Sequence, residues 1–465
     1  IWKTVVTMNL GQLAELCDAQ LIRGSPDVPV ERISTDTRSL TPRSCFVALQ
    51  GPRFDGHEFV TDAARSGASA AVVSDPTRAM NSPSALALLQ VQDTLTALHK
   101  LATNYRRLLP PTTRVIGVTG SSGKTTTKDL IAAVLGERFQ VLKTEGNTNN
   151  HIGLPLNLLR LDESHDFGVF ELGTNHPGEI RTLTGLCQPQ IGVITCIGLA
   201  HVEFLGDEAG VMREKASLIE ALPRNGDGLA VLNADDKWCQ ELRGRTRATV
   251  ITVGIDNFAD IRASDIRING DLKFRLNIAK KREDVVVRLK TLGRHQIYNA
   301  LQAAAVGYFA GMDLDDIREG LENAEFPKMR MQVIERDGVR YINDCYNANL
   351  PSMQAALRMM QEQPWPGRKV AILGDMLELG DWSAQAHRQV GEQAARSDLA
   401  MLLTVGPQAK QIALAALAAG METHRVLILQ DAAEAKDAVR GLVREGDFVL
   451  LKGSRRVGLE KVLEA

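Results

Sequence analysis

The segment from Gly117 to Thr127 constrains the fold of this 465-residue chain more than any other stretch. It follows the β-branched run Arg114–Thr119 and opens the helical pattern Thr125–Arg138, which is the setting that a phosphate-binding loop requires. Glycines let such a loop turn its backbone N–H groups toward phosphate oxygens, and the helix N-terminus adds partial positive charge. We therefore predict a nucleoside triphosphate site formed by Gly120, Ser121, Ser122, Gly123, Lys124, Thr125 and Thr126.

Two side chains of this loop carry specific chemistry. Lys124 is placed to reach the β- and γ-phosphates, and the Thr125 hydroxyl is placed to ligate Mg²⁺. The spacing departs from the strict G-x-x-x-x-G-K-[ST] pattern, because Gly117 stands one position early and Val118 occupies the glycine's place. A Gly/Ser-rich turn without phosphate is the alternative, and the placement of the lysine and threonine argues against it. A triphosphate site alone names no reaction, since kinases, motors, switches and ligases share it.

Strand and helix patterns alternate along most of the chain. Apolar strands at Phe167–Leu172, Gln190–Ile197 and Gly228–Asn233 alternate with helical stretches and predict a mainly parallel central sheet. Charged alternation within Val250–Leu292 predicts an antiparallel patch on the edge of that sheet. From about residue 313, five strands separated by four helices predict a second doubly wound domain.

A polar, breaker-rich stretch at residues 74–84 closes a first segment of short strands and helical patches. We therefore expect an α/β fold of three domains, with limits at residues 1–87, 88–312 and 313–465.

Composition excludes several classes of partner. The chain has 54 basic and 56 acidic residues and only 5% aromatics, which argues against nucleic-acid binding. No apolar run approaches the roughly 18 residues of a membrane span. The six cysteines form no CxxC pair, so we expect free thiols in a reducing cytoplasm. The start lacks signal-peptide features, and the sequence leaves open whether residues 1–7 are native or Met8 is the natural start.

Several further segments resemble signatures of the Mur ligase family, ATP-dependent ligases of peptidoglycan precursors. They are Gly146–Pro155, Glu171–Ile180, Ile197–Glu203, Gly293–Ala300 and Lys452–Arg455. The resemblance covers nearly the whole chain. It implies a small α/β UDP-binding domain, a central ATP-binding domain built on the phosphate loop, and a Rossmann-like C-terminal domain.

Within the family, other segments resemble the members that add D-alanyl-D-alanine to UDP-N-acetylmuramoyl-tripeptide. They are Ser34–Arg38, Phe46–Gly51, Phe54–His57, Asn343–Asn349 and Leu373–Gly380. The Asp-Asn-Pro-Arg segment of the sibling that adds the third amino acid is absent, and Leu350 stands where these members usually have proline. The resemblance implies that the tripeptide carboxylate attacks the γ-phosphate of ATP and that the dipeptide amine then displaces phosphate from the acyl phosphate.

The resemblance also implies a catalytic set of Lys124, Glu171, His201 and Lys215 with two Mg²⁺ ions. Glu171 ends an apolar strand, and its oxygens, like the Thr125 hydroxyl, suit that metal, although a carboxylate that only caps the strand is the alternative. His201 belongs beside the second ion, or is a structural histidine. Lys215 corresponds to the lysine that the family carbamylates, which makes it an oxygen ligand; read locally, it is an ordinary helix-surface lysine.

Substrate contacts follow from the same resemblance. Asn299 is the candidate for the adenine edge, or a helix-surface asparagine, and Arg330 and Asp344 are candidates for γ-phosphate and ribose contacts once the C-terminal domain closes. The candidates for the D-alanyl-D-alanine pocket are Asn347 and Asn349, with Asp375 and Glu378, which could equally be helix-capping carboxylates. Asp36, Thr37 and Arg38 are assigned to the UDP end, or form a surface turn. Asn149, Asn150 and His151 are assigned to the muramoyl-peptide channel, or only shape a turn.

Three hypotheses remain open from the sequence. The first is the D-alanyl-D-alanine ligase, working as a monomer. The second is another ligase on this scaffold, either a Mur ligase that adds meso-diaminopimelate or lysine, or a folylpolyglutamate-type synthetase. The third is a nucleotide-dependent binding protein that hydrolyses ATP without ligation, against which the set Glu171, His201 and Lys215 argues. The sequence does not say whether the third residue of the acceptor peptide is lysine or meso-diaminopimelate.

Overall fold

The computed structural model describes residues 8–464 except residues 53, 225 and 270. Within these residues the fold is mixed α/β, with three sheet-centred domains in chain order, as predicted. The predictions about the start of the chain concern residues 1–7, which lie outside the described residues. The contacts divide the chain into two compact units: residues up to Gly117 with Phe139–Gly173 and Gly178–Ile191, and Val118–Arg138 with Thr174–Pro177 and the chain from Gly192 onward.

The first domain is built on a sheet with the strand order β2-β9-β8-β5-β4. The pairs from β4 through β5 and β8 to β9 are parallel, and β2 pairs antiparallel with β9. Buried Phe46, Val73 and Leu88 belong to its core. The sheet extends to Gln90, past the predicted limit at residue 87. The elements of the first domain are β1 (Met8–Asn9), α1 (Leu10–Cys17), β2 (Gln20–Arg23), β3 (Pro29–Val30), β4 (Arg32–Ser34), η1 (Thr37–Ser39), β5 (Ser44–Val47), β6 (Gln50–Gly51), β7 (Phe54–Asp55), η2 (Gly56–Phe59), α2 (Val60–Arg65), β8 (Ala68–Val73), η3 (Pro76–Ala79) and β9 (Ala87–Gln90).

Helix α3 (Thr94–Leu108) connects the first domain with the central one. Asp93 caps its start by accepting a hydrogen bond from the Thr96 backbone N–H at 2.6 Å. Lys100 Nζ and Asp18 Oδ2 form an ion pair at 2.7 Å, so the helix is tied to the end of α1. Helix α3 also packs against α5 (Gly153–Leu158) and α6 (Glu179–Cys187).

The central sheet runs in the order β11-β12-β10-β13-β14-β15-β16-β17-β18. The pairs β11–β12, β14–β15 and β15–β16 are parallel, whereas β16–β17 and β17–β18 are antiparallel. The antiparallel patch predicted for the edge of the sheet is therefore confirmed for β16, β17 and β18, whereas β15, at the start of the predicted range, pairs in parallel. Its strands are β10 (Arg114–Thr119), β11 (Val141–Lys143), β12 (Phe167–Glu171), β13 (Ile191–Ile194), β14 (Leu229–Asn233), β15 (Thr249–Gly254), β16 (Ile261–Asn269), β17 (Asp271–Ile278) and β18 (Glu283–Leu289).

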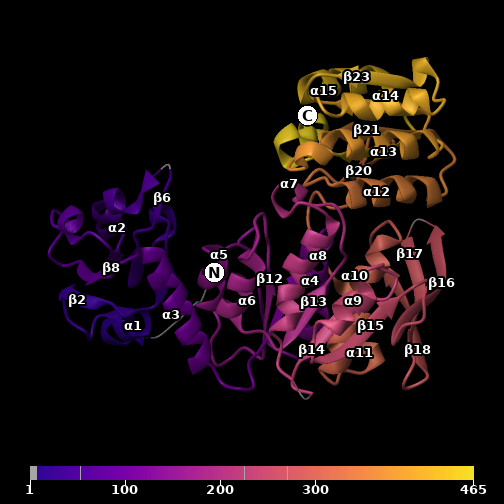
Figure 1. Ribbon diagram of the computed structural model, residues 1–465. Coiled ribbons are helices and arrows are strands. Elements are labelled where there is room, and N and C mark those ends of the chain that lie inside the picture. Colours follow the sequence, from indigo (N-terminus) through magenta and orange to yellow (C-terminus); the bar gives the residue numbers. More distant parts are fainter. Residues whose placement is uncertain (1–7, 53, 225, 270, 465) are drawn as a thin grey trace. The chain divides into compact units, whose positions relative to one another are not determined.

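The helix that follows the phosphate loop is enclosed by two later helices. α10 and α11 both pack against α4, and α11 also packs against β18 (Figure 1). Helix α11 starts at Leu314, beyond the predicted limit at residue 312, yet it contacts only central elements strongly. The remaining helices of this region are α4 (Lys124–Gly136), α7 (Val202–Leu205), α8 (Glu208–Glu220), α9 (Cys239–Gly244), α10 (His295–Phe309) and α11 (Leu314–Asn323).

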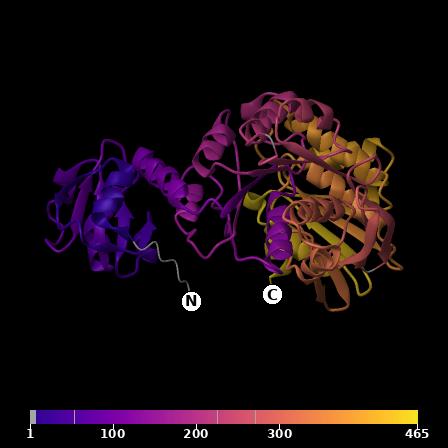
Figure 2. The same ribbon diagram turned by 90° about the horizontal axis from the view of Figure 1, so that it is seen from below.

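The C-terminal sheet has the order β19-β20-β24-β21-β22-β23, with helices along its strands (Figures 1 and 2). The five predicted strands are all present and pair in parallel, and β19 adds an antiparallel edge that the sequence analysis missed. Its elements are β19 (Gln332–Arg336), β20 (Val339–Asn343), α12 (Leu350–Glu362), β21 (Lys369–Gly374), η4 (Gly380–Trp382), α13 (Ser383–Ala395), β22 (Met401–Val405), α14 (Lys410–Ala418), η5 (Thr423–Arg425), β23 (Val426–Leu429), α15 (Ala432–Leu442), β24 (Phe448–Lys452), η6 (Arg455–Val457) and η7 (Leu459–Leu463).

The six cysteines are free thiols, as expected. In the part of the chain that is described, no helix combines the length and the apolar character that crossing a membrane demands.

Candidate active site

The phosphate loop joins β10 to α4, and two of its positions admit only glycine. Gly120 and Gly123 have φ values of +153° and +82°. A Cβ atom on Gly120 would lie 1.8 Å from Thr195 Oγ1, and one on Gly123 would lie 2.6 Å from Asn299 Oδ1. The loop is therefore wound tightly against the segment after β13 and against α10.

Hydrogen bonds hold the loop in this shape. Ser121 donates its backbone N–H to the Cys196 carbonyl at 2.9 Å, and its hydroxyl lies 2.9 Å from the Gly198 carbonyl oxygen. Lys124 Nζ donates to the Gly120 carbonyl at 2.9 Å, so the lysine folds back over its own loop. Thr125 is half-buried at the start of α4, whereas Thr126 is buried in the helix. Preformed curvature of this kind is what lets backbone N–H groups meet phosphate oxygens.

Asn299 lies beside the loop, buried on α10 rather than on the helix surface. Its Oδ1 accepts a hydrogen bond from Thr127 Oγ1 at 3.1 Å, and its Nδ2 donates to Gln296 Oε1 at 2.8 Å. Both ends of the carboxamide are therefore engaged within the protein, and the residue ties α10 to α4.

Lys215 is only 1% exposed, so the local interpretation of it as a helix-surface lysine is wrong. Burial, helped by the charge of Lys124 and opposed by Cys196 and Glu214, lowers its pKa to about 7. A pKa near 7 keeps a large fraction of the amine neutral at physiological pH. Lys215 and Lys124 thus lie within electrostatic reach of each other.

His201 precedes α7 in a left-handed backbone conformation, with φ of +56°. Its Nδ1 lies 2.8 Å from Glu378 Oε2. Burial lowers the pKa of His201; Glu378 opposes this shift, and the charges of Lys124 and Lys215 add to it. The hydrogen bond from His201 is in turn the main cause of the lowered pKa of Glu378. Lys124, Lys215 and His201 therefore lie close enough for the charges of the two lysines to influence the pKa of the histidine.

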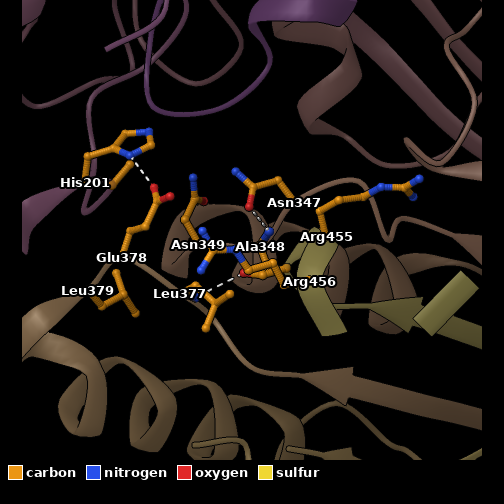
Figure 3. A pocket seen from close by; sticks show the side chains of 11 residues that line it. His201, Asn347, Ala348, Asn349, Leu377, Glu378, Leu379, Arg455 and Arg456 are labelled. Atoms are coloured by element: carbon orange, nitrogen blue, oxygen red, sulfur yellow. Dashed lines mark hydrogen bonds and ion pairs between the residues drawn. The ribbon is translucent and has the colours of Figure 1, made fainter. Parts of the chain in front are cut away.

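A cavity of about 130 Å³ opens beside His201, and Figure 3 shows the side chains around it. Its polar character comes from amide, imidazole, carboxylate and guanidinium groups. It is lined by Ala200, His201, Asn347, Ala348, Asn349, Leu377, Glu378, Leu379, Ser454, Arg455 and Arg456. Asn347 and Asn349, predicted for the dipeptide pocket, therefore share one cavity with His201.

The two acidic candidates of the third domain have different surroundings. Glu378 lines the cavity, whereas Asp375 is buried and its Oδ1 accepts hydrogen bonds from the backbone N–H groups of Gln408 at 3.0 Å and Ala409 at 2.6 Å. Asp375 thus caps the turn that leads into α14, which was the alternative interpretation for this pair.

Asp344 and Arg330 lie together at the start of the C-terminal domain. Asp344 Oδ2 accepts a hydrogen bond from the buried Lys452 Nζ at 2.6 Å, and Oδ1 accepts one from the Met331 backbone N–H at 3.1 Å. The Arg330 guanidinium stacks over the Tyr346 ring, 4.0 Å from its centroid. Neither residue lines the cavity described above.

Glu171 ends β12 as predicted and is buried. Its Oε1 accepts a hydrogen bond from Asn149 Nδ2 at 2.9 Å, so these two predicted residues are brought together. Asn150 Oδ1 accepts from the backbone N–H groups of Ile152 and Gly153 and shapes the turn before α5. His151 is exposed.

The predicted UDP contacts form a surface turn in the first domain. Asp36 accepts the backbone N–H of Arg38 at 3.0 Å and also its guanidinium, with Nη2 to Oδ2 at 2.7 Å. The Arg38 side chain is 88% exposed, so its guanidinium faces solvent. Thr37 is the first residue of η1 in the same turn.

Several residues of the cavity were missed as site candidates, among them Leu377, Arg455 and Arg456. A signal was available, because Lys452–Arg455 resembles a family signature and follows the last strand of a parallel sheet, where ligands bind in doubly wound folds. Among the described residues, no group of three or more His, Cys, Asp or Glu side chains is arranged to hold a metal ion.

Comparison with known proteins adds independent evidence. Three family models match: "Mur ligase family, catalytic domain" over residues 29–106, "Mur ligase middle domain" over 118–307, and "Mur ligase, glutamate ligase domain" over 329–455. The chain is 36% identical to the UDP-N-acetylmuramoyl-tripeptide–D-alanyl-D-alanine ligase of Escherichia coli, covering 99% of this chain and 98% of that one.

Solved structures agree with the sequence comparison. The crystal structure of MurF from Acinetobacter baumannii has a TM-score of 0.89 and 32% identity, covering 99% of this chain and 98% of that one. MurF ligase from Thermotoga maritima in complex with ADP has a TM-score of 0.81 and 29% identity, covering 93% and 96%. With near-complete coverage in sequence and structure, the chain belongs to the Mur ligase family.

Proposed function

We propose that this chain is an ATP-dependent, ADP-forming amide ligase that adds D-alanyl-D-alanine to UDP-N-acetylmuramoyl-tripeptide for peptidoglycan synthesis. The tripeptide carboxylate attacks the γ-phosphate of ATP, and the dipeptide amine then displaces phosphate from the acyl phosphate. The products are the UDP-linked pentapeptide, ADP and phosphate. The relatives named above bear the name of this ligase, and neither alternative ligase is favoured.

One observation in the molecule carries the proposal. Lys215 is buried within electrostatic reach of Lys124 and His201, and His201 lines the cavity that also holds Asn347 and Asn349. Acyl-phosphate formation depends mainly on positioning and on neutralising phosphate charge. A nucleotide-dependent binding protein without ligation would not require a buried lysine and a histidine beside its phosphate loop.

The ATP phosphates bind at the loop from Gly120 to Thr126, where Lys124 exchanges its bond to Gly120 for a phosphate oxygen. Asn299 supports the loop through its hydrogen bond with Thr127. Its Nδ2 can contact adenine only if the hydrogen bond to Gln296 breaks. Arg330 and Asp344 are the proposed contacts from the C-terminal domain. Closure of that domain would exclude water from the acyl phosphate.

We propose two Mg²⁺ ions, which take mainly oxygen ligands. Thr125 would offer a hydroxyl, Glu171 would offer a buried carboxylate, and His201 would lie beside the second ion. Lys215 becomes an oxygen ligand if its neutral amine takes up CO₂, and burial favours the neutral amine. When bound, the ions would neutralise phosphate charge.

Substrate contacts complete the proposal. Asn347 and Asn349 are the proposed amide contacts of D-alanyl-D-alanine, Asn349 through the second Nδ2 hydrogen that its bond to Ser121 leaves over. The Arg455 guanidinium, which pairs with Glu460 at 3.0 Å, suits the dipeptide carboxylate. The UDP end is assigned to Asp36, Thr37 and Arg38, and the muramoyl-peptide channel to Asn149, Asn150 and His151. We place the enzyme, as a monomer, in the bacterial cytoplasm, where ATP is available and free thiols persist.

Phosphate release and product mass test the function. The enzyme receives ATP, Mg²⁺ and UDP-N-acetylmuramoyl-tripeptide, with lysine or meso-diaminopimelate as third residue, and then D-alanyl-D-alanine or another amine. We expect phosphate release and a product heavier by one dipeptide only when D-alanyl-D-alanine is present. Release that ignores the dipeptide, or an equal response to glutamate or meso-diaminopimelate, would overturn the proposal. Lys124→Met should abolish turnover, whereas Lys410→Met, at an exposed helix position, should not.

A further inference from the structure

Residues 200–206 and 377–382 meet through three contacts. His201 Nδ1 lies 2.8 Å from Glu378 Oε2, and Trp382 Nε1 donates to the Gly206 carbonyl at 3.1 Å. A Cβ atom on Gly380 would lie 3.2 Å from Glu203 Cβ, so the two backbones approach closely. In Figure 3 the His201 ring and the Glu378 carboxylate point toward each other at the edge of the cavity.

Both members of this pair have an unusual backbone. His201 has φ of +56° and Glu378 has φ of +62°. A side chain in the left-handed region carries a conformational cost, and such costs persist where the surrounding structure fixes a particular geometry. Neither position carries glycine, although glycine would avoid that cost. Each of the two positions therefore holds a side chain in a conformation that glycine would adopt at lower cost.

The chemistry of the contact fixes the imidazole tautomer. An ionised carboxylate only accepts hydrogen bonds, so Nδ1 must carry the proton that His201 donates to Glu378. In the neutral ring the lone pair is then on Nε2. A carboxylate that holds the far nitrogen of a functional histidine also fixes the orientation of the ring.

We propose that Glu378 is the positioning residue of His201, supplied by the C-terminal domain to hold the imidazole as its Nδ1–H tautomer with Nε2 available to the reaction. This inference rests on the proposed function, because it gives His201 a task in amide formation. It also gives the C-terminal domain a second role: besides lining the cavity, that domain fixes the tautomer of His201, which belongs to the central domain.

The direct test is the tautomer of His201. Nitrogen NMR of histidine-labelled protein at pH 8, assigned with a His201→Gln variant, should show the Nδ1–H form in the wild type. Glu378→Ala removes the acceptor but keeps a Cβ, so its backbone cost is unchanged; His201 should then shift toward the Nε2–H form that free imidazole prefers. Glu378→Gln keeps an acceptor oxygen and should restore the wild-type signal. Asp381→Asn, at an exposed carboxylate three residues along, is the matched control and should change nothing.

Kinetics separate positioning from direct substrate contact. We expect Glu378→Ala to lower kcat at least tenfold with KM for D-alanyl-D-alanine within about twofold, and Glu378→Gln to recover most of kcat. A raised KM with unchanged kcat would mean that Glu378 binds the dipeptide directly, and would overturn the inference. An unchanged His201 tautomer in Glu378→Ala would overturn it as well. If the wild type forms no amide, the proposed function fails, and the NMR comparison still decides whether Glu378 sets the tautomer.

Discussion

The side-chain amide of Asn349 caps α12 and holds the phosphate loop at the same time. Its Oδ1 accepts the backbone N–H of Ser352 at 3.0 Å, and its Nδ2 donates to the Ser121 carbonyl at 2.9 Å. The first bond satisfies a donor at the start of the helix, as an N-cap residue does. The second reaches from the C-terminal domain into the loop proposed to bind ATP. One asparagine therefore couples the start of α12 to the nucleotide site.

Changing Asn349 to aspartate should separate these two functions. Aspartate caps helices as well as asparagine does, but it cannot donate to the Ser121 carbonyl and would place negative charge against it. We expect a Tm close to that of the wild type and a loss of about tenfold in kcat/KM for ATP, which corresponds to the roughly 1.4 kcal/mol of one lost hydrogen bond. Thermal unfolding and steady-state phosphate release measure the two effects.

A matched substitution is available in the first domain. Asn9 caps α1 with the same reciprocal arrangement, in which it bonds to Gln12 at the third helical position. Asn9→Asp should leave both Tm and turnover unchanged. Full activity in Asn349→Asp would contradict the proposed link between α12 and the phosphate loop.

Alanine at Gly123 should damage the loop for two independent reasons. The position has φ of +82°, and the new Cβ would lie 2.6 Å from Asn299 Oδ1. We expect the affinity for ADP, measured by calorimetry, to fall at least tenfold. The free energy of unfolding should fall by roughly 1–3 kcal/mol.

The control for this substitution lies at the other end of α4, which Gly123 precedes. A Cβ on Gly136, in the last turn of α4, would meet no atom within 4 Å. Gly136→Ala should therefore be neutral or slightly stabilising, because alanine is the better helix former. Equal ADP affinity in both alanine variants would show that the tight winding at Gly123 is not needed.

The sequence predicted the phosphate loop and its flanking elements because residue type and spacing act locally there. Gly123 and Lys124 must stand between a strand and a helix for the loop to work, and the helix predicted over Thr125–Arg138 is observed as α4, Lys124–Gly136. Lys215 was different. Its burial depends on how the whole domain packs, and the charges that act on it, those of Lys124 and Cys196, belong to residues distant in the sequence.

Long-range contacts also decide to which domain the elements near the predicted limits belong. β9 begins at Ala87 and belongs to the first sheet because it pairs with β8 and β2, which are distant in sequence. α11 belongs with α4 and β18 for a similar reason: a Cβ on its Gly320 would lie 2.5 Å from Val134 Cα. Helix and strand patterns predict the elements, but pairing partners decide to which layer an element belongs.

The structural contacts of the asparagines could not be predicted from the sequence. A carboxamide both donates and accepts, so a motif indicates that it is needed but not where it is used. In the structure, Asn150 closes a turn, Asn299 joins two helices and Asn349 both caps a helix and holds a loop.

Asp344→Asn should destabilise the C-terminal domain. Lys452 is buried and donates to Asp344 Oδ2 at 2.6 Å, so removing the negative charge leaves a buried ammonium without its counter-ion. Breaking a buried pair in this way costs about 3–5 kcal/mol. Urea unfolding of the single variant and of Asp344→Asn with Lys452→Met distinguishes the cause: the double variant should regain much of the loss. A double variant no more stable than the single one would argue against the ion pair as the source.

Removing the amine of Lys215 tests the carbamate. Lys215→Ala should lose most of its activity, with partial recovery when a short carboxylic acid such as acetate is supplied in place of the carbamate oxygens. Phosphate release with and without acetate measures the recovery, and acetate should not affect Lys124→Met. An alanine variant as active as the wild type would exclude a carbamate at this position.

The neutral amine of Lys215 should also appear in the pH dependence of stability. The pKa is about 7 in the folded protein, against an ordinary value of 10.5. Between these two values the unfolded chain binds one more proton than the folded chain, so the contribution of Lys215 to the free energy of unfolding rises with pH, by about 1.4 kcal/mol per pH unit at most. Below pH 7 the destabilisation by this lysine is complete, and above pH 10.5 it is absent.

Lys215→Met, which keeps the length of the side chain without the charge, should remove that contribution. In CO₂-free buffer we expect the variant to unfold at higher urea than the wild type at pH 7, with the difference shrinking steadily toward pH 10. Lys410→Met, at an exposed position on α14, should follow the wild type at each pH. Parallel curves for the wild type and Lys215→Met across this range would mean that the lysine keeps its proton when buried. The amine would then not be available to take up CO₂, and the carbamate would need a different explanation.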